Sequence, residues 1–501
     1  MVIKCAKCLV PLVLTATFSG IALLAASNEE VGTRPVKLPG LVLMSPYSEQ
    51  LQVSPLPKGA DQAVPHQSFA SPQRSEQKDQ TPSPGTTAPG SDYSRYVPGT
   101  TVGSFNQTGA ISLKGLVFIK PSAVISYAYE SNLQALNNRQ QPDRSLVVTP
   151  NIEIYLPFTR DRVRIEYATH YRNYQKFNIA QNFDHTLNVD SVFNFTPILS
   201  LAVRDHFAMS AVNSNEYMPG KEVIFSDSRF KRNTLGLQMN WTISENDSLG
   251  FNTDWNHVFF NESANPKATP FYNYDQYAFS GTYKRELSER FGVFTAGSYR
   301  QNSTGDPRGI SNSKGFEFSG GIDGAITPLI TGQFSAGVSF DRYPGASKES
   351  ARSVVFRGSF AKEITERSQV SISLSRASNL SYFQKNAYFV TTGIGAAYSR
   401  ELRPDIAFSF TTSYQRNGYP LSVEAGSGIP GDLVGSQRRL DSFVDAAFSV
   451  RYRYNDWLAM DVRFDVIRRN SNIPGFCFNS YRGGINLLIG SRGSPAGRSP
   501  Y

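Results

Sequence analysis

The chain has little cysteine, methionine and tryptophan, and only five histidines in 501 residues. Two of its three cysteines, Cys5 and Cys8, lie close to the N-terminus, so Cys477 stands alone in the rest of the chain. One cysteine forms no internal disulfide and cannot build a cysteine-rich metal site. We predict that Cys477 lies in an ordinary loop, and we expect no metal and no cofactor.

Long apolar runs are also scarce. After the N-terminal segment, none reaches the roughly 20 residues of a membrane-spanning helix. The net charge of +9 is modest, and no basic cluster or known motif indicates a nucleic-acid partner. A nucleophile elbow, a carboxylate pair and a phosphate loop are absent as well. The sequence therefore predicts neither an enzyme nor any catalytic residue.

The first 26 residues resemble a targeting signal. Lys4 and Lys7 precede an apolar stretch from Leu9 to Leu24, which ends in Ala25 and Ala26. This order is typical of a Sec-type signal peptide, and we predict one over residues 1–26. A single membrane anchor is the alternative, although the stretch is short for a spanning helix.

A polar, proline-rich segment follows. Residues 28–105 hold eleven of the 29 prolines, together with many serines, glutamines and glycines. Such a composition cannot bury enough apolar area to offset the entropy of ordering the chain. We predict a disordered periplasmic linker over residues 27–110, which acts as a spacer or tethers the protein to a partner or the cell wall. A barrel over 111–490 and a short tail over 491–501 complete the predicted organisation.

The barrel is predicted from hairpins such as residues 146–172. Val163, Ile165 and Tyr167 alternate with Arg164 and Glu166, which is the period of a strand with one apolar and one charged face. The runs are about ten residues or longer, as tilted strands that cross a bilayer need to be. The fold class is thus all-β: a transmembrane antiparallel up-and-down β-barrel of about 18 strands, preceded by the disordered segment.

The spacing of the strands supports this topology, because short and long connections alternate as they do in outer-membrane barrels. Two long connections, 210–231 and 416–439, could fold into the lumen as a plug. The last strand, Tyr481–Gly490, is similar to an outer-membrane assembly signal. We predict strands over 116–130, 145–156, 162–172, 184–195, 199–209, 232–243, 247–259, 274–287, 291–299, 313–326, 330–343, 351–364, 368–377, 387–402, 405–415, 440–454, 457–468 and 480–490.

Charged residues on the polar phase of these strands are the candidate pore lining. An arginine that faces lipid at mid-depth costs about 2–4 kcal/mol, so these side chains are predicted to point inward. They either form a constriction or solute track, or they are a solvated wall of mixed ion pairs. Asp205 falls on the apolar phase, which suggests a bulge or a rim position, and Pro121 in the first strand suggests a bulge or a late strand start. The pore-lining candidates are Arg164, Glu166, Arg204, Asp254, Arg357, Arg451, Arg453, Asp461, Arg463 and Asp465.

Four histidines, His170, His185, His206 and His257, lie toward one end of the first half of the barrel. A metal or catalytic group is one interpretation. However, His170 and His206 share the inward phase while His257 does not, so convergence on one ion is not expected.

The start of the barrel resembles the putative β-barrel porin 2 type of outer-membrane protein. Its first strand ends in Tyr129, Glu130 and Asn132, and the next contains Pro150 followed by alternating apolar residues. The resemblance implies a porin-like barrel that accompanies exopolysaccharide or capsule export. We expect a channel in the Gram-negative outer membrane, with a general small-solute porin and a non-conducting structural or adhesive barrel as alternatives.

This interpretation also implies partners. They are outer-membrane lipid and lipopolysaccharide, the barrel assembly machinery, and, for the export role, a polysaccharide and a periplasmic export component. The N-terminal linker and the C-terminus are expected on the periplasmic side, because an even number of strands leaves both ends on the side of the short turns.

Overall fold

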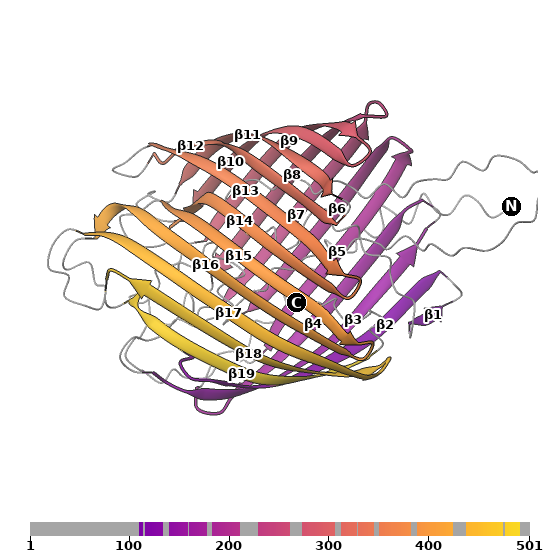
Figure 1. The fold of residues 1–501 in the computed structure, drawn as a ribbon, viewed down its shortest axis with the longest axis vertical. Helices are drawn as coiled ribbons and strands as arrows, with labels where there is room; N and C mark the ends of the chain where they lie inside the picture. Colours follow the sequence, from indigo (N-terminus) through magenta and orange to yellow (C-terminus); the bar gives the residue numbers. More distant parts are fainter. Residues whose placement is uncertain are drawn as a thin grey trace, which may run out of the picture. The chain divides into compact units, whose positions relative to one another are not determined.

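A computed structural model describes residues 110–490, and its fold is drawn in Figure 1. Residues 114–115, 134–139, 159, 178–182, 211–228, 261–272, 306–311, 328, 345–349, 382–387, 424–436 and 474–475 are not described. The predicted signal peptide, almost all of the predicted linker, and the predicted tail therefore lie outside the described residues.

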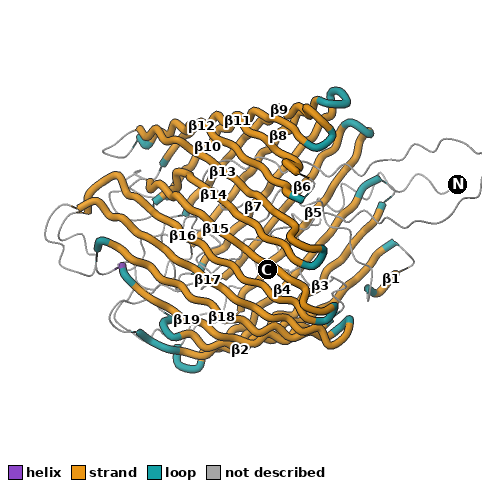
Figure 2. Tube along the Cα trace, viewed as in Figure 1, coloured by secondary structure: helices purple, strands orange, loops and turns teal. Residues whose placement is uncertain are grey.

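The described chain consists almost entirely of strands and the turns between them, as Figure 2 shows. It holds no helix with the length and hydropathy of a membrane span. The strands are β1 (Ile111–Leu113), β2 (Val117–Glu130), β3 (Asp143–Pro157), β4 (Arg162–Tyr174), β5 (Phe183–Thr196), β6 (Leu199–Ser210), β7 (Phe230–Thr242), β8 (Asp247–Phe260), β9 (Tyr274–Ser288), β10 (Phe291–Thr304), β11 (Ser313–Thr327), β12 (Ile330–Arg342), β13 (Ser350–Thr365), β14 (Ser368–Leu380), β15 (Tyr388–Arg403), β16 (Ile406–Val423), β17 (Gln437–Asn455), β18 (Leu458–Ser471) and β19 (Phe478–Ile489).

The sheet closes on itself. From β2 to β19, each strand pairs antiparallel with the next along the chain. The last strand, β19, pairs with β2 from Arg482 opposite Glu130 to Ile489 opposite Ala123. This ladder completes an 18-stranded up-and-down barrel and confirms the predicted fold class.

A short additional strand, β1, was not predicted. It pairs with Val117–Ile119 of β2, just beyond the point where the β19 ladder ends at Ala123. Gly490 follows β19 with a φ of 114°, and a Cβ there would lie 2.7 Å from the carbonyl oxygen of Pro121. Only glycine takes this conformation and this close approach without strain, so the chain can turn away from β2 at the end of the ladder.

In contrast to a soluble protein, the barrel has its large apolar side chains on the outside and many of its polar and charged side chains on the inside. Large apolar residues of the strands point outward and are exposed; Phe318, Val354 and Phe464 have 59, 60 and 47% of their surface accessible. Buried positions include charged and polar residues such as Asp441 and Glu317. Alternation along each strand produces this arrangement, because successive side chains face opposite sides of the sheet. The exposed apolar band suits lipid and the inner face suits water.

The connections are sorted by length, as predicted. Those that follow odd-numbered strands from β3 to β17 have at most four residues, and those that follow even-numbered strands from β2 to β18 have at least six. We call the two ends of the barrel the short-turn end and the long-loop end. At one short turn, the Arg403 guanidinium lies 2.8 Å from Asp405 and lowers the pKa of that carboxyl group.

Three expectations about individual positions are wrong. Asp205 and Pro121 both lie in continuous ladders without a bulge, and Asp205 is in the middle of β6 on the outward face. Pro121 is tolerated because it lies between the ends of β19 and β1, where β2 has no neighbour on that edge and a missing N–H leaves no ladder bond unmade. The predicted loop 416–439 is shorter, since β16 extends to Val423 and β17 begins at Gln437.

The two faces of β14 allow a direct test of the inside-out arrangement. Ile372 is exposed on the outward face and its neighbour Ser373 faces inward. We predict that Ile372→Arg destabilises the folded barrel in lipid by about 2–4 kcal/mol, whereas Ser373→Arg has a much smaller effect. Denaturant titrations of barrels folded in vesicles measure the difference. Equal losses of stability for the two variants would contradict the assignment of faces.

Candidate channel wall

The ladder registers identify the residues that share the inner face. Because residues directly opposite each other in a ladder point to the same side of the sheet, the inner rows can be followed from strand to strand. The structure places all ten predicted pore-lining side chains on this inner face, in several groups. That these residues line a conducting pore stays a prediction.

The first group centres on Arg164 of β4. Its guanidinium contacts Glu153 of β3, lies 3.0 Å from Glu166, and lies 4.0 Å from Asp190 of β5. Asp190 is also 4.0 Å from Arg204 of β6. Five charged groups thus form one continuous network across β3–β6. Sequence reasoning found three of them, whereas Glu153 and Asp190 were missed although both lie on the polar phase.

The second group lies on β17 and β18. Arg451 is 3.6 Å from Asp461, and Arg463 is 2.7 Å from Asp465. Arg453 does not join these pairs. It donates a hydrogen bond of 2.9 Å to the carbonyl oxygen of Pro404 and so fastens a turn at the short-turn end.

Of the remaining two candidates, Arg357 belongs to a separate ion pair, and Asp254 lies in the same inner row as Arg204 with Gly236 between them. Arg357 of β13 bonds to Glu317 of β11 at 2.8 Å. Asp254 of β8 accepts a hydrogen bond of 2.6 Å from Asn252.

Two further inner ion pairs were not predicted, and each spans an intervening strand, from β10 to β12 and from β9 to β11. Arg300 pairs with Asp341 at 3.1 Å, and Lys284 pairs with Asp323 at 2.7 Å. Their polar phase was visible in the sequence. Their partners were not, because each partner lies on another strand and only the ladder register brings the two together. Paired charges are the arrangement expected of a solvated wall of mixed ion pairs, and a role of these residues in a constriction or solute track stays a prediction.

Between the charged sectors the inner wall carries small hydroxyl side chains. Ser359 lies opposite Ser373, and Ser399 lies opposite Ser409, whose hydroxyl is 2.7 Å from that of Ser449. Glycine and alanine separate many of these positions, so few bulky side chains cover them. We call this surface on β13–β17 the serine arc. It comprises Ser359, Ser371, Ser373, Ser375, Ser399, Ser409, Thr411, Ser413 and Ser449.

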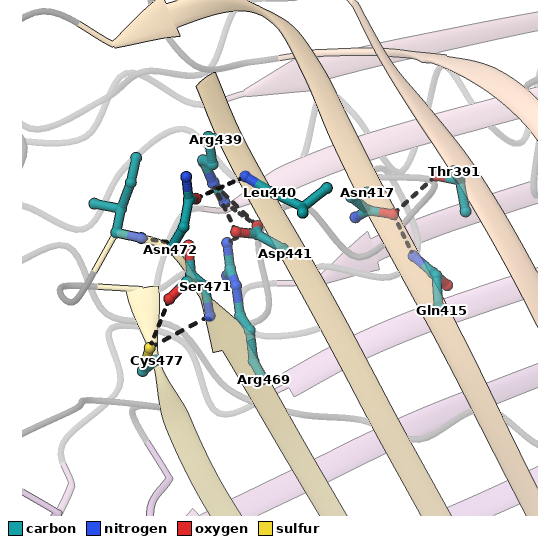
Figure 3. A network of polar contacts seen from close by, with 11 residues as sticks. Thr391, Gln415, Asn417, Arg439, Leu440, Asp441, Arg469, Ser471, Asn472 and Cys477 are labelled. Carbon is teal, nitrogen blue, oxygen red and sulfur yellow. Dashed lines mark hydrogen bonds and ion pairs between the residues drawn. The ribbon is translucent and has the colours of Figure 1, made fainter. Parts of the chain in front are cut away.

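Near the long-loop end, a buried ionic cluster joins β17 and β18 (Figure 3). Asp441 accepts a hydrogen bond of 2.6 Å from Arg439 and another of 2.6 Å from Arg469. Phe476 covers both arginines, with its ring centroid 3.8 Å from Cζ of Arg439 and 5.1 Å from Cζ of Arg469. Cation–π contacts of this kind strengthen when water is excluded. The cluster holds a residue of the β18–β19 connection, Phe476, against the inner wall.

Cys477 follows this cluster and is held by the backbone of Ser471, with both Sγ contacts at 3.3 Å. The predicted position in a loop is therefore correct, since the residue lies just before β19. Figure 3 shows the sulfur at the end of the β18–β19 hairpin.

The histidines do not converge. His170 hydrogen-bonds Thr149 and His206 hydrogen-bonds Asn188 on the inner face, whereas His185 contacts Tyr167 and His257 contacts Asp275 on the outer face. Within the described part of the chain, no group of three or more potential ligands could hold a metal ion.

Comparison with known proteins assigns the family. The family model described as "Putative beta-barrel porin 2" matches residues 113–489. The chain belongs to this family. It is an outer-membrane porin-like β-barrel, and the predicted family is confirmed. No curated protein matches the chain.

Solved structures with a similar fold share little sequence. OpdK from Pseudomonas aeruginosa, crystallised with vanillate, is 11% identical, with 74% of this chain and 98% of OpdK covered at a TM-score of 0.42. OccAB3 from Acinetobacter baumannii is 11% identical, with 75 and 99% covered and a TM-score of 0.40. The siderophore receptor PirA from Pseudomonas aeruginosa is 9% identical, with 74 and 80% covered and a TM-score of 0.42.

Removing cations from the Arg164 network should change ion selectivity. In Arg164→Ser combined with Arg204→Ser, the carboxylates of Glu153, Glu166 and Asp190 remain while the two neighbouring cations are removed. We expect the reversal potential in a KCl gradient across a planar bilayer to shift toward cation selectivity, since the wall gains negative charge. The matched control replaces two outward cations, Lys362 and Arg400, by serine and should leave the potential unchanged. An unaltered potential in the Arg164/Arg204 variant would remove both residues from the conducting path.

The Asp441 cluster gives a stability prediction. Asp441→Asn removes the carboxylate that the buried Arg439 and Arg469 share, and we expect a loss of about 3–5 kcal/mol in unfolding free energy. Asp405→Asn, which breaks an exposed pair, should have a much smaller effect, because solvent screens that pair. Denaturant titrations followed by the gel mobility of the folded barrel measure both. A similar small loss in the two variants would show that the cluster contributes little.

Proposed function

We propose that the protein is a channel for hydrophilic solutes in the outer membrane, with the short-turn end toward the periplasm. One observation carries this proposal: the closed barrel has an inner wall of polar and charged residues and an outer face with a band of exposed apolar residues. A barrel of this strand number encloses an aqueous lumen rather than a packed side-chain core. The orientation follows from the general rule that outer-membrane barrels have short periplasmic turns and longer external loops.

The wall chemistry supports an uncharged or weakly charged, hydroxyl-rich cargo. The described inner cations of the two charged sectors have carboxylates nearby, so the field across these sectors partly cancels. The serine arc offers hydroxyl groups that both donate and accept hydrogen bonds, as sugar hydroxyls do. We therefore propose exopolysaccharide as the exported cargo, in agreement with the family resemblance described above.

Conduction tests the channel itself. The purified protein should form ion-conducting channels in planar bilayers and should admit neutral oligosaccharides in liposome-swelling assays. A barrel that stays closed in both assays would overturn the channel proposal and favour a structural or adhesive role. Swelling with monosaccharides alone would favour the small-solute porin.

The serine arc can be tested with adjacent residues. Ser373→Trp together with Ser409→Trp places two large side chains on the inner wall, so we expect a lower conductance and slower oligosaccharide entry. Ile372→Trp adds the same side chain to the outward face and should change neither. Equal behaviour of the inward and outward variants would exclude the serine arc from the solute path.

A deletion strain tests the cargo. We expect loss of surface polysaccharide while uptake of small solutes is unchanged. Retention of the polysaccharide together with slower solute uptake would replace the export role by that of a general porin.

A further inference from the structure

Exposed cations gather on the outward face of the barrel at its long-loop end. Seven of the eight strands from β11 to β18 contribute one each. Lys314 and Arg342 lie directly opposite each other, and Arg376 and Arg416 flank the same residue, Thr392 of β15. We call these residues the basic belt. It comprises Lys314, Arg342, Arg352, Arg376, Arg416, Arg438 and Arg468.

The belt has no carboxylate partners within the described residues. Its contacts are neutral: Arg376 donates to the carbonyl oxygen of Val354 at 3.2 Å and to the Thr392 hydroxyl at 2.7 Å, and Arg468 donates to the Asn470 side chain at 3.1 Å. On the described parts of β11–β18, no aspartate or glutamate shares the outward phase. Seven like charges on one face repel one another unless an anion lies between them.

The short-turn end differs from the belt. There, outward Arg285 lies 3.8 Å from Asp247, and Arg403 lies 2.8 Å from Asp405. The short-turn end also has two outward cations without a described acid beside them, Lys362 and Arg400. The belt differs in being a row of seven such cations, and a row of this length indicates that the belt meets an anion from outside the chain.

The belt lies at the edge of the exposed apolar band. Arg342 follows exposed Phe340 by two residues, and Arg416 follows exposed Tyr414 by two residues. Two residues of a strand span about 7 Å, so the guanidinium groups lie at the depth where lipid headgroups begin. Arg352 remains close to the apolar band, with its Cζ 5.7 Å from the centroid of the Phe340 ring.

We infer that the basic belt binds the phosphate groups of a phosphorylated glycolipid in the outer leaflet. This inference rests on the orientation proposed above. Six of the seven residues are arginines, whose planar guanidinium forms paired hydrogen bonds with phosphate oxygens. A second copy of the chain would bring the same positive face and be repelled. The described outward acids of the long-loop half, Asp205 and Asp275, lie on other strands, β6 and β9.

Bound lipid is the direct measurement. The variant carries Arg342→Gln, Arg352→Gln, Arg416→Gln and Arg468→Gln, and the matched control carries Lys362→Gln and Arg400→Gln at the short-turn end. Native mass spectrometry of the full-length protein with bisphosphorylated lipid A measures retention of the lipid. We expect wild type and control to bind it alike, and the belt variant to bind it about tenfold more weakly or worse. Phosphatase-treated lipid A should bind wild type as weakly as intact lipid A binds the variant.

Three outcomes would overturn the inference. They are equal retention by belt variant and control, equal binding of dephosphorylated lipid by wild type, and a change from oligomer to monomer in the variant without any change in bound lipid. Conductance of the belt variant is measured in parallel and should match wild type. If the protein conducts but its basic belt binds no lipid, this inference alone is refuted. If the protein never conducts, the proposed channel is refuted.

Discussion

The structure depends on one constraint: a strand in lipid must give every backbone N–H and C=O group a partner on a neighbouring strand. In the hydrocarbon region no water can take that place, so only a sheet that closes on itself is stable there. The ladder from Arg482 opposite Glu130 to Ile489 opposite Ala123 provides this closure. It joins the two ends of the run of hairpins from Val117 to Ile489, and β1 continues the pairing of β2 beyond the end of that ladder.

Closure also determines what the two faces can do. Once the sheet is a ring, the alternation of side chains separates a lipid-facing surface from an inner wall, and charges on the inner phase are brought within reach of one another. Arg164 contacts carboxylates from three strands, and Arg357 reaches Glu317 across the intervening strand β12. These pairs stabilise a wall that is polar without carrying a strong field of one sign. The serine arc is also polar and carries no strong field, because its side chains are uncharged hydroxyl groups. Both features are the basis of the proposed passage of hydroxylated molecules.

The two ends of the barrel are built differently. At the short-turn end, two- to four-residue turns are fastened by local contacts such as Arg403 with Asp405 and Arg453 with the Pro404 carbonyl. At the long-loop end, the Asp441 cluster holds part of the last connection against the inner wall, while the basic belt lies on the outside. The row of seven outward cations without a described acid on its face agrees with the phosphorylated lipid inferred above for one leaflet of the bilayer.

The sequence by itself determined the strands, their number, the sorting of turns and loops and the phase of each charge, because a period of two and the turn residues are local properties of the chain. Thus Arg164 and Asp461 could be placed on the inward phase without coordinates. The tertiary structure alone decided the register, and with it the partners: Glu153 and Asp190 around Arg164, the meeting of Arg439 with Arg469 at Asp441, and the alignment of seven cations into a belt. It also corrected Asp205, whose outward position at mid-strand contradicts the pattern of its neighbours. Such pairings join residues far apart in the chain, and only the ladder hydrogen bonds bring them together.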